Sequence, residues 1–461
     1  MGDNRYGGIV AAGLTMGLAI PAAAPRIAAQ DAPRSQPVAL AEVERLAADA
    51  QEEVERLRGW KFKRPVPVRL LTQEEARTWS QEVMAEEAGD AQHRALELAA
   101  ARMIGLLPPD CDPMQVFSEI MCGNAPGMYD HHAKVVYVVD VPDADYCTQF
   151  VCTTLVHELT HALDDQYFDL VRLLDRGKQC SDAQHVIGAV VEGSAIVLQN
   201  RYSAISRLLG RGDREAMRRS VKRAMQDAQR LMDAPPYVAA FMARFPCGSS
   251  FLVYGQNTLP GGGEGVGDAL RIAAIDPPCS TEQILHPAKY WEDNRRDEPV
   301  QVDENDVRDL LADAGLHSVH TDTMGELYCA ILTRPEDRKL SPTATVMPGF
   351  WTNPAAAGWG GDRFFLLSDE PLEDDGEAVP AELCGLWLTA WDTPADREEF
   401  ITAYAEHRPS SSRTVLRLGT GCAVFFYGID QGQKDFLAGR LQSSPPRCTH
   451  HGLPWRIEAP G

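Results

Sequence analysis

The stretch Thr153-Thr-Leu-Val-His157-Glu158-Leu-Thr-His161-Ala-Leu-Asp-Asp165 carries the strongest signal in the sequence. Residues four apart on an α-helix lie one above the other, so His157 and His161 present two imidazoles on one face. Two imidazoles at this spacing can bind one tetrahedral ion at about 2.0 to 2.1 Å. Glu158 lies about 100° around the helix axis from His157, where it can reach a water without binding the metal itself. The stretch therefore predicts a metal-binding helix.

The bare pattern His-Glu-x-x-His also arises by chance, with a probability of about one in fifty in a chain of this histidine content. The alternative is a pair of solvated or core-satisfied histidines on an ordinary helix. The neighbouring side chains favour the metal site, because they give the helix an apolar bulk to bury and place the histidines at the edge of a core. These side chains are Leu155, Val156, Leu159, Ala162 and Leu163.

A third ligand is expected from a later helix, and Glu192 in the stretch Gly188-Ala-Val-Val-Glu192-Gly-Ser-Ala195 is the best candidate. It is a lone carboxylate among apolar and very small residues, and a buried acid is costly unless it meets a cation. The small residues after it would let two helices approach closely. There are two alternatives. Glu192 forms a structural ion pair, or His185 is the third ligand. Three protein ligands with an open fourth position are typical of a catalytic metal site.

Hydrophobic periodicity and turn residues predict an α+β fold in two parts. The first part is a mostly helical metal-binding domain at 39–340 with a small sheet. Its expected elements are helices at 39–58, from Thr72, 90–106, 145–167 and 183–208, a strand at 65–71 and a hairpin at 127–140. The second is a smaller α+β module at 341–461, with strands at 364–367, 384–390, 415–418 and 423–427 and helices at 394–406 and 434–441.

The N-terminus predicts export. A charged start, an apolar run from about Gly8 to Ala24 and small residues near Ala28 match a signal peptide at 1–29, followed by a linker at 30–38. The expected location is secreted or periplasmic, and the alternative is an uncleaved N-terminal anchor. The 11 cysteines all follow the expected cleavage point, so some disulfides are plausible, and the odd count leaves at least one thiol unpaired within the chain.

The composition of 44% hydrophobic and 24% charged residues is that of a globular protein. The formal net charge of -22 repels phosphate backbones, and no basic run with interleaved aromatic residues offsets it. Nucleic acid is therefore excluded as an expected partner. No later segment approaches the length of a membrane span, so no stable span is expected after signal cleavage.

The string HELTHALDDQ (157–166), followed by VVEGSA (190–195), resembles the glutamate-zincin metallopeptidases, a broad thermolysin-like group in which a Glu from a later helix completes His-Glu-x-x-His. More narrowly, the chain resembles uncharacterised bacterial zincin-like proteins with HELTHALxDQ, an EGxA helix and STEQILHPxKY, here residues 280–290. This resemblance spans about residues 125–363, including DTMGEL (322–327) and GWGGDR (358–363). It implies a zincin-like fold with Zn²⁺ on His157, His161 and Glu192, and Glu158 as general base.

One departure from the thermolysin-like pattern concerns the residue that orients a ligating histidine. The pattern often continues as Glu-x-x-x-Asp, whereas Ile196 stands four residues after Glu192. A carboxylate from elsewhere is needed for this role. The candidates are Asp164, Asp165 and Glu326.

Stabilisation of an oxyanion needs a further donor near the metal, and relatives of this group commonly use a downstream His or Tyr. His286 and Tyr290 are the candidates, with turn-capping and groove-filling as their alternative roles. The resemblance further implies that the hairpin at 127–139 lines the cleft and that an extended substrate adds to its edge. His131 and His132 at its tip are expected to be solvated turn residues.

Together these observations predict hydrolysis of a peptide or protein substrate outside the cytoplasm. A catalytically silent zinc- or substrate-binding protein of the same fold is one alternative, although a non-catalytic site does not require a base at Glu158. A metal-dependent hydrolase of other amides or esters is a second. A serine or cysteine hydrolase is set aside, because the sequence has no GxSxG element and no cysteine in a nucleophile context.

Overall fold

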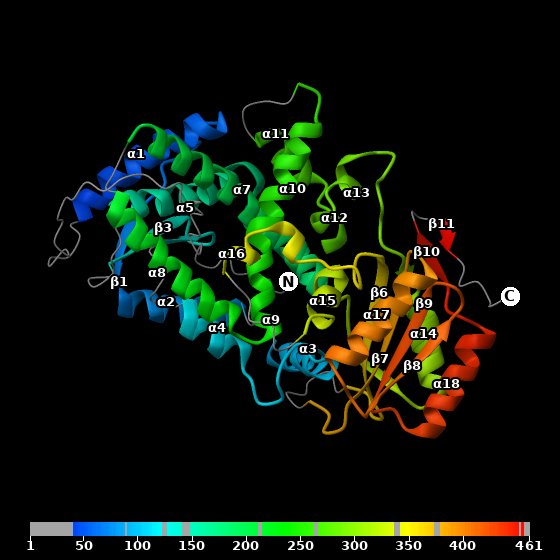
Figure 1. Ribbon diagram of the computed structural model, residues 1–461. Coiled ribbons are helices and arrows are strands. Elements are labelled where there is room, and N and C mark those ends of the chain that lie inside the picture. The colour runs from blue at the N-terminus through cyan, green and yellow to red at the C-terminus, as the bar shows by residue number, and fades with distance from the viewer. Residues whose placement is uncertain are drawn as a thin grey trace.

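The computed structural model describes residues 40–87, 90–121, 127–140, 148–210, 214–261, 266–335, 342–372, 379–450 and 453–455. The expected signal peptide and linker lie outside these residues. The chain has the mixed α+β fold that its sequence predicts, with small sheets among many helices (Figure 1).

The helices are α1 (Leu40–Arg58), α2 (Gln73–Glu87), α3 (Ala91–Ile104), α4 (Pro113–Met121), α5 (Thr148–Phe168), α6 (Leu170–Asp175), α7 (Ser181–Leu208), α8 (Arg214–Met232), α9 (Pro236–Ala239), α10 (Arg244–Thr258), α11 (Gly267–Ile275), α12 (Thr281–Leu285), α13 (Ala288–Trp291), α14 (Glu304–Asp313), α15 (Gly325–Leu332), α16 (Pro342–Thr345), α17 (Pro394–His407) and α18 (Gln431–Ser443). The strands are β1 (Val68–Thr72), β2 (Gly127–Asp130), β3 (Val135–Asp140), β4 (Gln301–Val302), β5 (His317–Asp322), β6 (Trp359–Ser368), β7 (Cys384–Trp391), β8 (Arg413–Leu418), β9 (Cys422–Tyr427), β10 (Cys448–His450) and β11 (Leu453–Trp455).

The predicted hairpin forms β2 and β3, and β1 pairs with β3 in parallel, so the sheet order is β1-β3-β2. The turn at residues 131–134 is closed by Asp130, whose side chain accepts hydrogen bonds from the N–H groups of His132 and Ala133. The next element after β1, helix α2, begins with the predicted cap: Thr72 and Glu75 bond each other's backbone N–H groups. The strand β2 is left as an edge of the sheet.

Helix α7 packs against both α5 and α10, and the three helices form the interior of the helical part. Helix α5 is buried around most of its circumference between Thr153 and Asp165. Its buried hydroxyls are satisfied within the helix, because Thr160 donates to the carbonyl of Val156 over 2.6 Å. Helix α7 is likewise buried over most of its length. Side chains on these helices therefore reach one another without contact with water.

Glycines set the distance between α7 and α10. A Cβ added to Gly193 on α7 would collide with the backbone of Gly248 on α10, and one added to Gly248 would collide with the carbonyl of Ala189. The small residues after Glu192 were expected to permit a close helix approach. The close approach is to α10, whereas Ser194 bonds Asp164 on α5.

A five-stranded sheet of order β5-β6-β7-β9-β8 forms the other end of the molecule (Figure 1). Alternate side chains of β6 point to opposite faces. Phe364 joins the main core with α15 and α17, while Phe365 joins a second cluster with α14 and α18. One face of the sheet thus continues the core that contains α5 and α7.

The sheet crosses the expected domain boundary at 340/341. Strand β5 precedes the boundary and pairs antiparallel with β6, with Asp322 opposite Phe364. Strand β4 also precedes it and pairs with β10 near the C-terminus. The segment His317-Ser-Val-His-Thr-Asp322 is almost entirely polar. It gave little sign of a strand in the sequence, because only Val319 has a β-branched apolar side chain.

No helix in the described ranges is long and apolar enough to cross a membrane. No disulfide joins two of the described cysteines.

Candidate metal centre

His157 and His161 lie one turn apart on α5 and point to the same place. Their Nε2 atoms are 3.1 Å apart, and the rings meet edge to face with centroids 4.7 Å apart. Both residues are at most 1% exposed. The i, i+4 spacing therefore produces the convergence that the sequence predicts.

Glu192 on α7 faces these two imidazoles. Its Oε2 lies 3.3 Å from Nε2 of His157 and 3.6 Å from Nε2 of His161. In a tetrahedral zinc site with bonds of about 2.0 to 2.1 Å, two ligand atoms are about 3.3 Å apart. The three separations of 3.1, 3.3 and 3.6 Å bracket that value. The residues present therefore fit a tetrahedral ion.

The ligand atoms also lack other partners. Oε2 of Glu192 accepts no hydrogen bond from the described residues, although Glu192 is only 2% exposed. Burial raises the pKa of Glu192, but His157 and His161 outweigh burial and hold the pKa at about 2. A buried, ionised carboxylate beside two imidazole nitrogens is stabilised by positive charge, which a bound cation can supply. A divalent ion would satisfy all three atoms at once.

Gln199 orients His157. Its Oε1 lies 2.8 Å from Nδ1 of His157, and because the amide oxygen can only accept, Nδ1 carries the proton and Nε2 keeps its lone pair for a metal. Sequence reasoning missed Gln199, since it sought a carboxylate for this role. The available signal was spacing: Gln199 follows Glu192 by seven residues (199 minus 192), which places both on one face of α7.

A buried ion pair lies one turn beyond His161 on α5. Asp164 accepts a hydrogen bond from Arg58 over 2.9 Å and another from Ser194 of α7. Both members of the ion pair have side chains that are at most 4% exposed. Burial raises the pKa of Asp164, while Arg58 and Ser194 oppose the rise. Of the three carboxylates expected behind the ligands, Asp164 is the one whose charge acts on His161.

The side chain of Glu158 on α5 faces the edge strand β2. It is 1% exposed, it accepts a hydrogen bond from the backbone N–H of Tyr129, and its Oε1 has no partner among the described residues. A Cβ on Gly127 would lie 3.1 Å from Cγ2 of Thr154 and 3.2 Å from the carbonyl oxygen of Tyr137, so the glycine lets β2 pack closely on α5. Burial raises the pKa of Glu158, and the charge of Glu192 adds to the rise. The carboxylate is therefore shifted toward the pKa range of a general base.

Asp165 ties the hairpin to α5. It accepts hydrogen bonds from the hydroxyl of Tyr129 over 2.6 Å and from Nζ of Lys134 over 2.7 Å. Asp165 therefore supports β2 and not a ligating histidine. His131 at the hairpin tip was expected to be solvated. It is only 3% exposed, and burial lowers its pKa to about 4, because the hairpin folds back onto the helix.

His286 and Tyr290 are not in contact with the three ligands in the described structure. His286 lies just after α12, with Nε2 3.0 Å from Oε1 of Glu326. Tyr290 on α13 is 5% exposed, donates to the carbonyl of Asp276 over 2.5 Å and packs on Phe251. Glu326 also accepts a hydrogen bond from Thr352, so it is engaged away from the histidines of α5. The oxyanion role of His286 and Tyr290 stays a prediction.

A second group of acids has the spacing of a metal site. Carboxylate oxygens of Glu282, Asp297 and Asp392 lie within 4.8 Å of one another. Nζ of Lys289 lies 2.6, 2.8 and 3.4 Å from them. The ammonium group therefore supplies the cation that these acids need. The lysine of the STEQILHPAKY stretch is structural here.

The other motifs of the narrow resemblance meet in a buried polar network. Asp182 at the start of α7 accepts from the N–H of Thr281 over 3.1 Å, and Asp322 accepts from the hydroxyl of Ser181 over 2.6 Å. Asp362 accepts from the N–H groups of Met324 and Gly325. These contacts join β5 and α12 to the first turn of α7, and they join β6 to the start of α15. The motifs thus fix the helix that carries Glu192.

Comparison with known proteins identifies one partial match. A family profile described as "Domain of unknown function (DUF8575)" matches residues 312–433. The matched segment runs from the end of α14 through β9 to the start of α18 and contains none of the residues on α5 or α7. No curated protein and no solved structure matches the chain.

Proposed function

We propose that this protein is a zinc metallopeptidase that hydrolyses peptide bonds in an extracytoplasmic compartment. His157, His161 and Glu192 are the zinc ligands, and Glu158 is the general base. The observation that carries the proposal is the triangle of buried ligand atoms, with sides of 3.1, 3.3 and 3.6 Å.

Zinc, when bound, lowers the pKa of water and polarises a substrate carbonyl. Glu158 takes the proton of the attacking water and later delivers it to the leaving amine, so that the C–N bond breaks and the carboxyl product forms. Its raised pKa suits both steps, because the group must accept and then release one proton. Gln199 keeps Nε2 of His157 unprotonated, and the Arg58–Asp164 pair fixes the turn of α5 after His161.

The decisive experiment measures zinc and cleavage together. The purified protein is expected to hold one zinc ion and to cleave members of a mixed peptide library, while Glu158→Gln keeps the zinc and loses roughly 100-fold or more of the rate. Glu52→Gln, an exposed change on α1, is the matched control and should leave both properties unchanged. Absence of bound zinc in the parent protein would overturn the proposal.

A second function is favoured by one observation. All three ligands and Glu158 are at most 2% exposed, which also suits a zinc-binding protein without catalysis. Zinc bound equally by the parent and by Glu158→Gln, with no cleavage by either, would support this alternative. The same metal chemistry can hydrolyse peptides, other amides and esters. A library that contains all three substrate classes therefore distinguishes a peptidase from a hydrolase of other substrates.

A further inference from the structure

Arg244 at the start of α10 reaches across α7 close to Glu192. A Cβ on Gly188 would lie 2.6 Å from Cδ and 2.7 Å from Nε of Arg244. The glycine therefore makes room for the arginine side chain. Gly188 precedes Glu192 by four residues, which is one turn and about 6 Å along the helix axis. The guanidinium thus lies one turn from the metal-binding carboxylate.

Arg244 has no acidic partner among the described residues, and its Nε has no acceptor. Its guanidinium carbon lies 4.8 Å from the centre of the Phe241 ring. Burial lowers the pKa of Arg244, and the charge of Glu192 opposes this from beyond ion-pair distance. Arg58, by contrast, has Asp164 at 2.9 Å. The Arg244 side chain is partly exposed, so its guanidinium is reachable from solvent, and a bound carboxylate would supply the acidic partner that the described residues do not.

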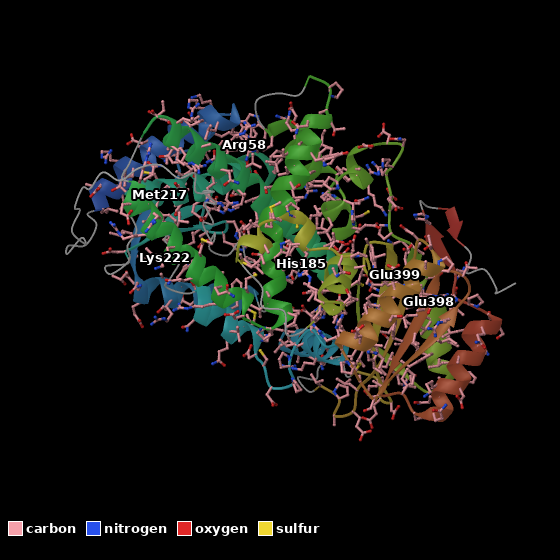
Figure 2. All side chains as sticks on the ribbon, viewed as in Figure 1. Arg58, His185, Met217, Lys222, Glu398 and Glu399 are labelled. Carbon is pink, nitrogen blue, oxygen red and sulfur yellow. The ribbon has the colours of Figure 1, made fainter. Side chains whose placement is uncertain are left out.

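His185 lies on α7, three residues before Gly188 and on the same face of that helix. This position is near Arg244 of α10. It is 4% exposed, and neither ring nitrogen has a hydrogen-bond partner in the described structure. Its ring meets that of Tyr328 edge to face at 5.0 Å. Figure 2 places it near the centre of the molecule. Burial and the charge of Arg244 hold its pKa well below the usual value, so the imidazole is neutral and offers one N–H donor.

The nearby acids of the candidate metal centre do not pair with Arg244. Asp164 is bound to Arg58 over 2.9 Å, and Glu192 acts on Arg244 only from beyond ion-pair distance. A single substrate carboxylate at Arg244 would therefore meet a cation that has no acidic partner among the described residues.

We infer that Arg244 and His185 form the subsite for a substrate carboxylate, one helical turn from the metal ligand Glu192. A planar guanidinium suits a carboxylate because it can donate two parallel hydrogen bonds, and the N–H of His185 supplies a third donor. The inference rests on the proposed function. The carboxylate is either the free C-terminus of a peptide or an acidic side chain next to the cleaved bond, and these two sources share the same chemistry.

The test uses the full-length, zinc-loaded Glu158→Gln protein, which binds peptides without cleaving them. Three mixtures of short N-acetylated peptides serve as probes: free C-terminal acids without Asp or Glu, the same sequences as C-terminal amides, and amides that contain Asp or Glu. Equilibrium dialysis with mass spectrometry measures the bound fraction. Carboxylate-bearing peptides are expected to bind roughly 10- to 100-fold more tightly than neutral amides. The mixture that binds more tightly than the neutral amides identifies the source of the carboxylate.

Arg244→Met in the same background should remove this preference and retain one zinc ion. Arg45→Met, which removes one charge from the exposed surface of α1, should leave the preference intact. Equal binding of acids and amides by the Glu158→Gln protein overturns the inference even if Arg244→Met fails to fold, since this comparison needs no change at Arg244. Zinc binding and peptide cleavage by the parent protein test the proposed function separately.

Discussion

Oε1 of Gln199 lies 2.8 Å from Nδ1 of His157, so the helix that supplies Glu192 also orients a histidine on the helix against which it packs. The contact between α5 and α7 therefore positions both His157 and Glu192. A shift of α7 along α5 would displace the carboxylate and the hydrogen bond to the imidazole together.

Replacing Gln199 by Leu should lower zinc affinity roughly 10- to 100-fold, because His157 loses the acceptor that fixes its tautomer and ring plane. Competition with a chromophoric chelator at constant pH measures the change. Gln431→Leu on the exposed surface of α18 is the control. Unchanged affinity in Gln199→Leu would show that the hydrogen bond does not orient the ligand.

Asp164→Ala should lower the free energy of unfolding by roughly 3–5 kcal/mol, because Arg58 is left as an unpaired charge in the interior. The double variant Arg58→Met with Asp164→Leu removes both charges and should recover most of this loss. Urea unfolding of the metal-free proteins provides the comparison. A double variant no more stable than Asp164→Ala would contradict the charge argument.

Gly248→Ala should destabilise the protein by about 1–3 kcal/mol or more and weaken zinc binding, since the added methyl group forces α10 away from α7 beside Glu192. Gly439→Ala on α18 is the matched control. Its new Cβ meets no atom within 4 Å, and the helix should gain about 0.5–1 kcal/mol. Thermal unfolding and zinc titration of both variants test the prediction, which fails if the two glycines respond alike.

The buried network at the start of α7 should make stability depend on pH. Burial raises the pKa of Asp182 to about 7, above its value in the unfolded chain. Such a group contributes its full stability below the unfolded pKa of about 3.9 and loses it as pH rises toward 7. The stability of Asp182→Asn relative to the parent should therefore increase between about pH 4 and pH 7.

Asp306 provides the control for this pH experiment. Its hydrogen bond to Arg447 lowers its pKa to about 2, so its stabilising contribution is lost only as pH falls below the unfolded value. The difference between Asp306→Asn and the parent should stay flat from about pH 5 to pH 7. Urea titrations across this range measure both differences, and a flat profile for Asp182→Asn would contradict its assigned pKa.

The sequence predicted the parts of the molecule that local rules determine. The spacing of His157 and His161 fixes their convergence once a helix forms, and the lone acid at Glu192 has few ways to be buried. The hairpin and its turn at Asp130 followed from alternation and turn residues. The α+β class and the long helices α1, α5 and α7 were predicted for the same reason, whereas α8, α10 and α14 were not.

Contacts between distant segments were not predictable from local rules. Gln199 and Lys289 owe their roles to the groups that folding brings beside them, and the residue type alone does not indicate such a role. Strand β5 is the outer strand of its sheet and carries mostly polar side chains, so hydrophobic alternation did not reveal it. Gly193 was rightly associated with close helix packing, but which helix it meets depends on the position of α10.

The shared core has a further consequence for dissection of the protein. Phe364, Trp387 and Phe425 of the sheet belong to the same cluster as Leu159 of α5, and the hydroxyl of Tyr404 on α17 donates to the carbonyl of Ile104 on α3 over 2.7 Å. Truncation near residue 340 would remove β6 and α17, leave β5 without its neighbouring strand and expose the core side chains that these elements cover, such as Leu327 on α15. The fragment ending there should aggregate, and the intact chain should melt as one cooperative unit.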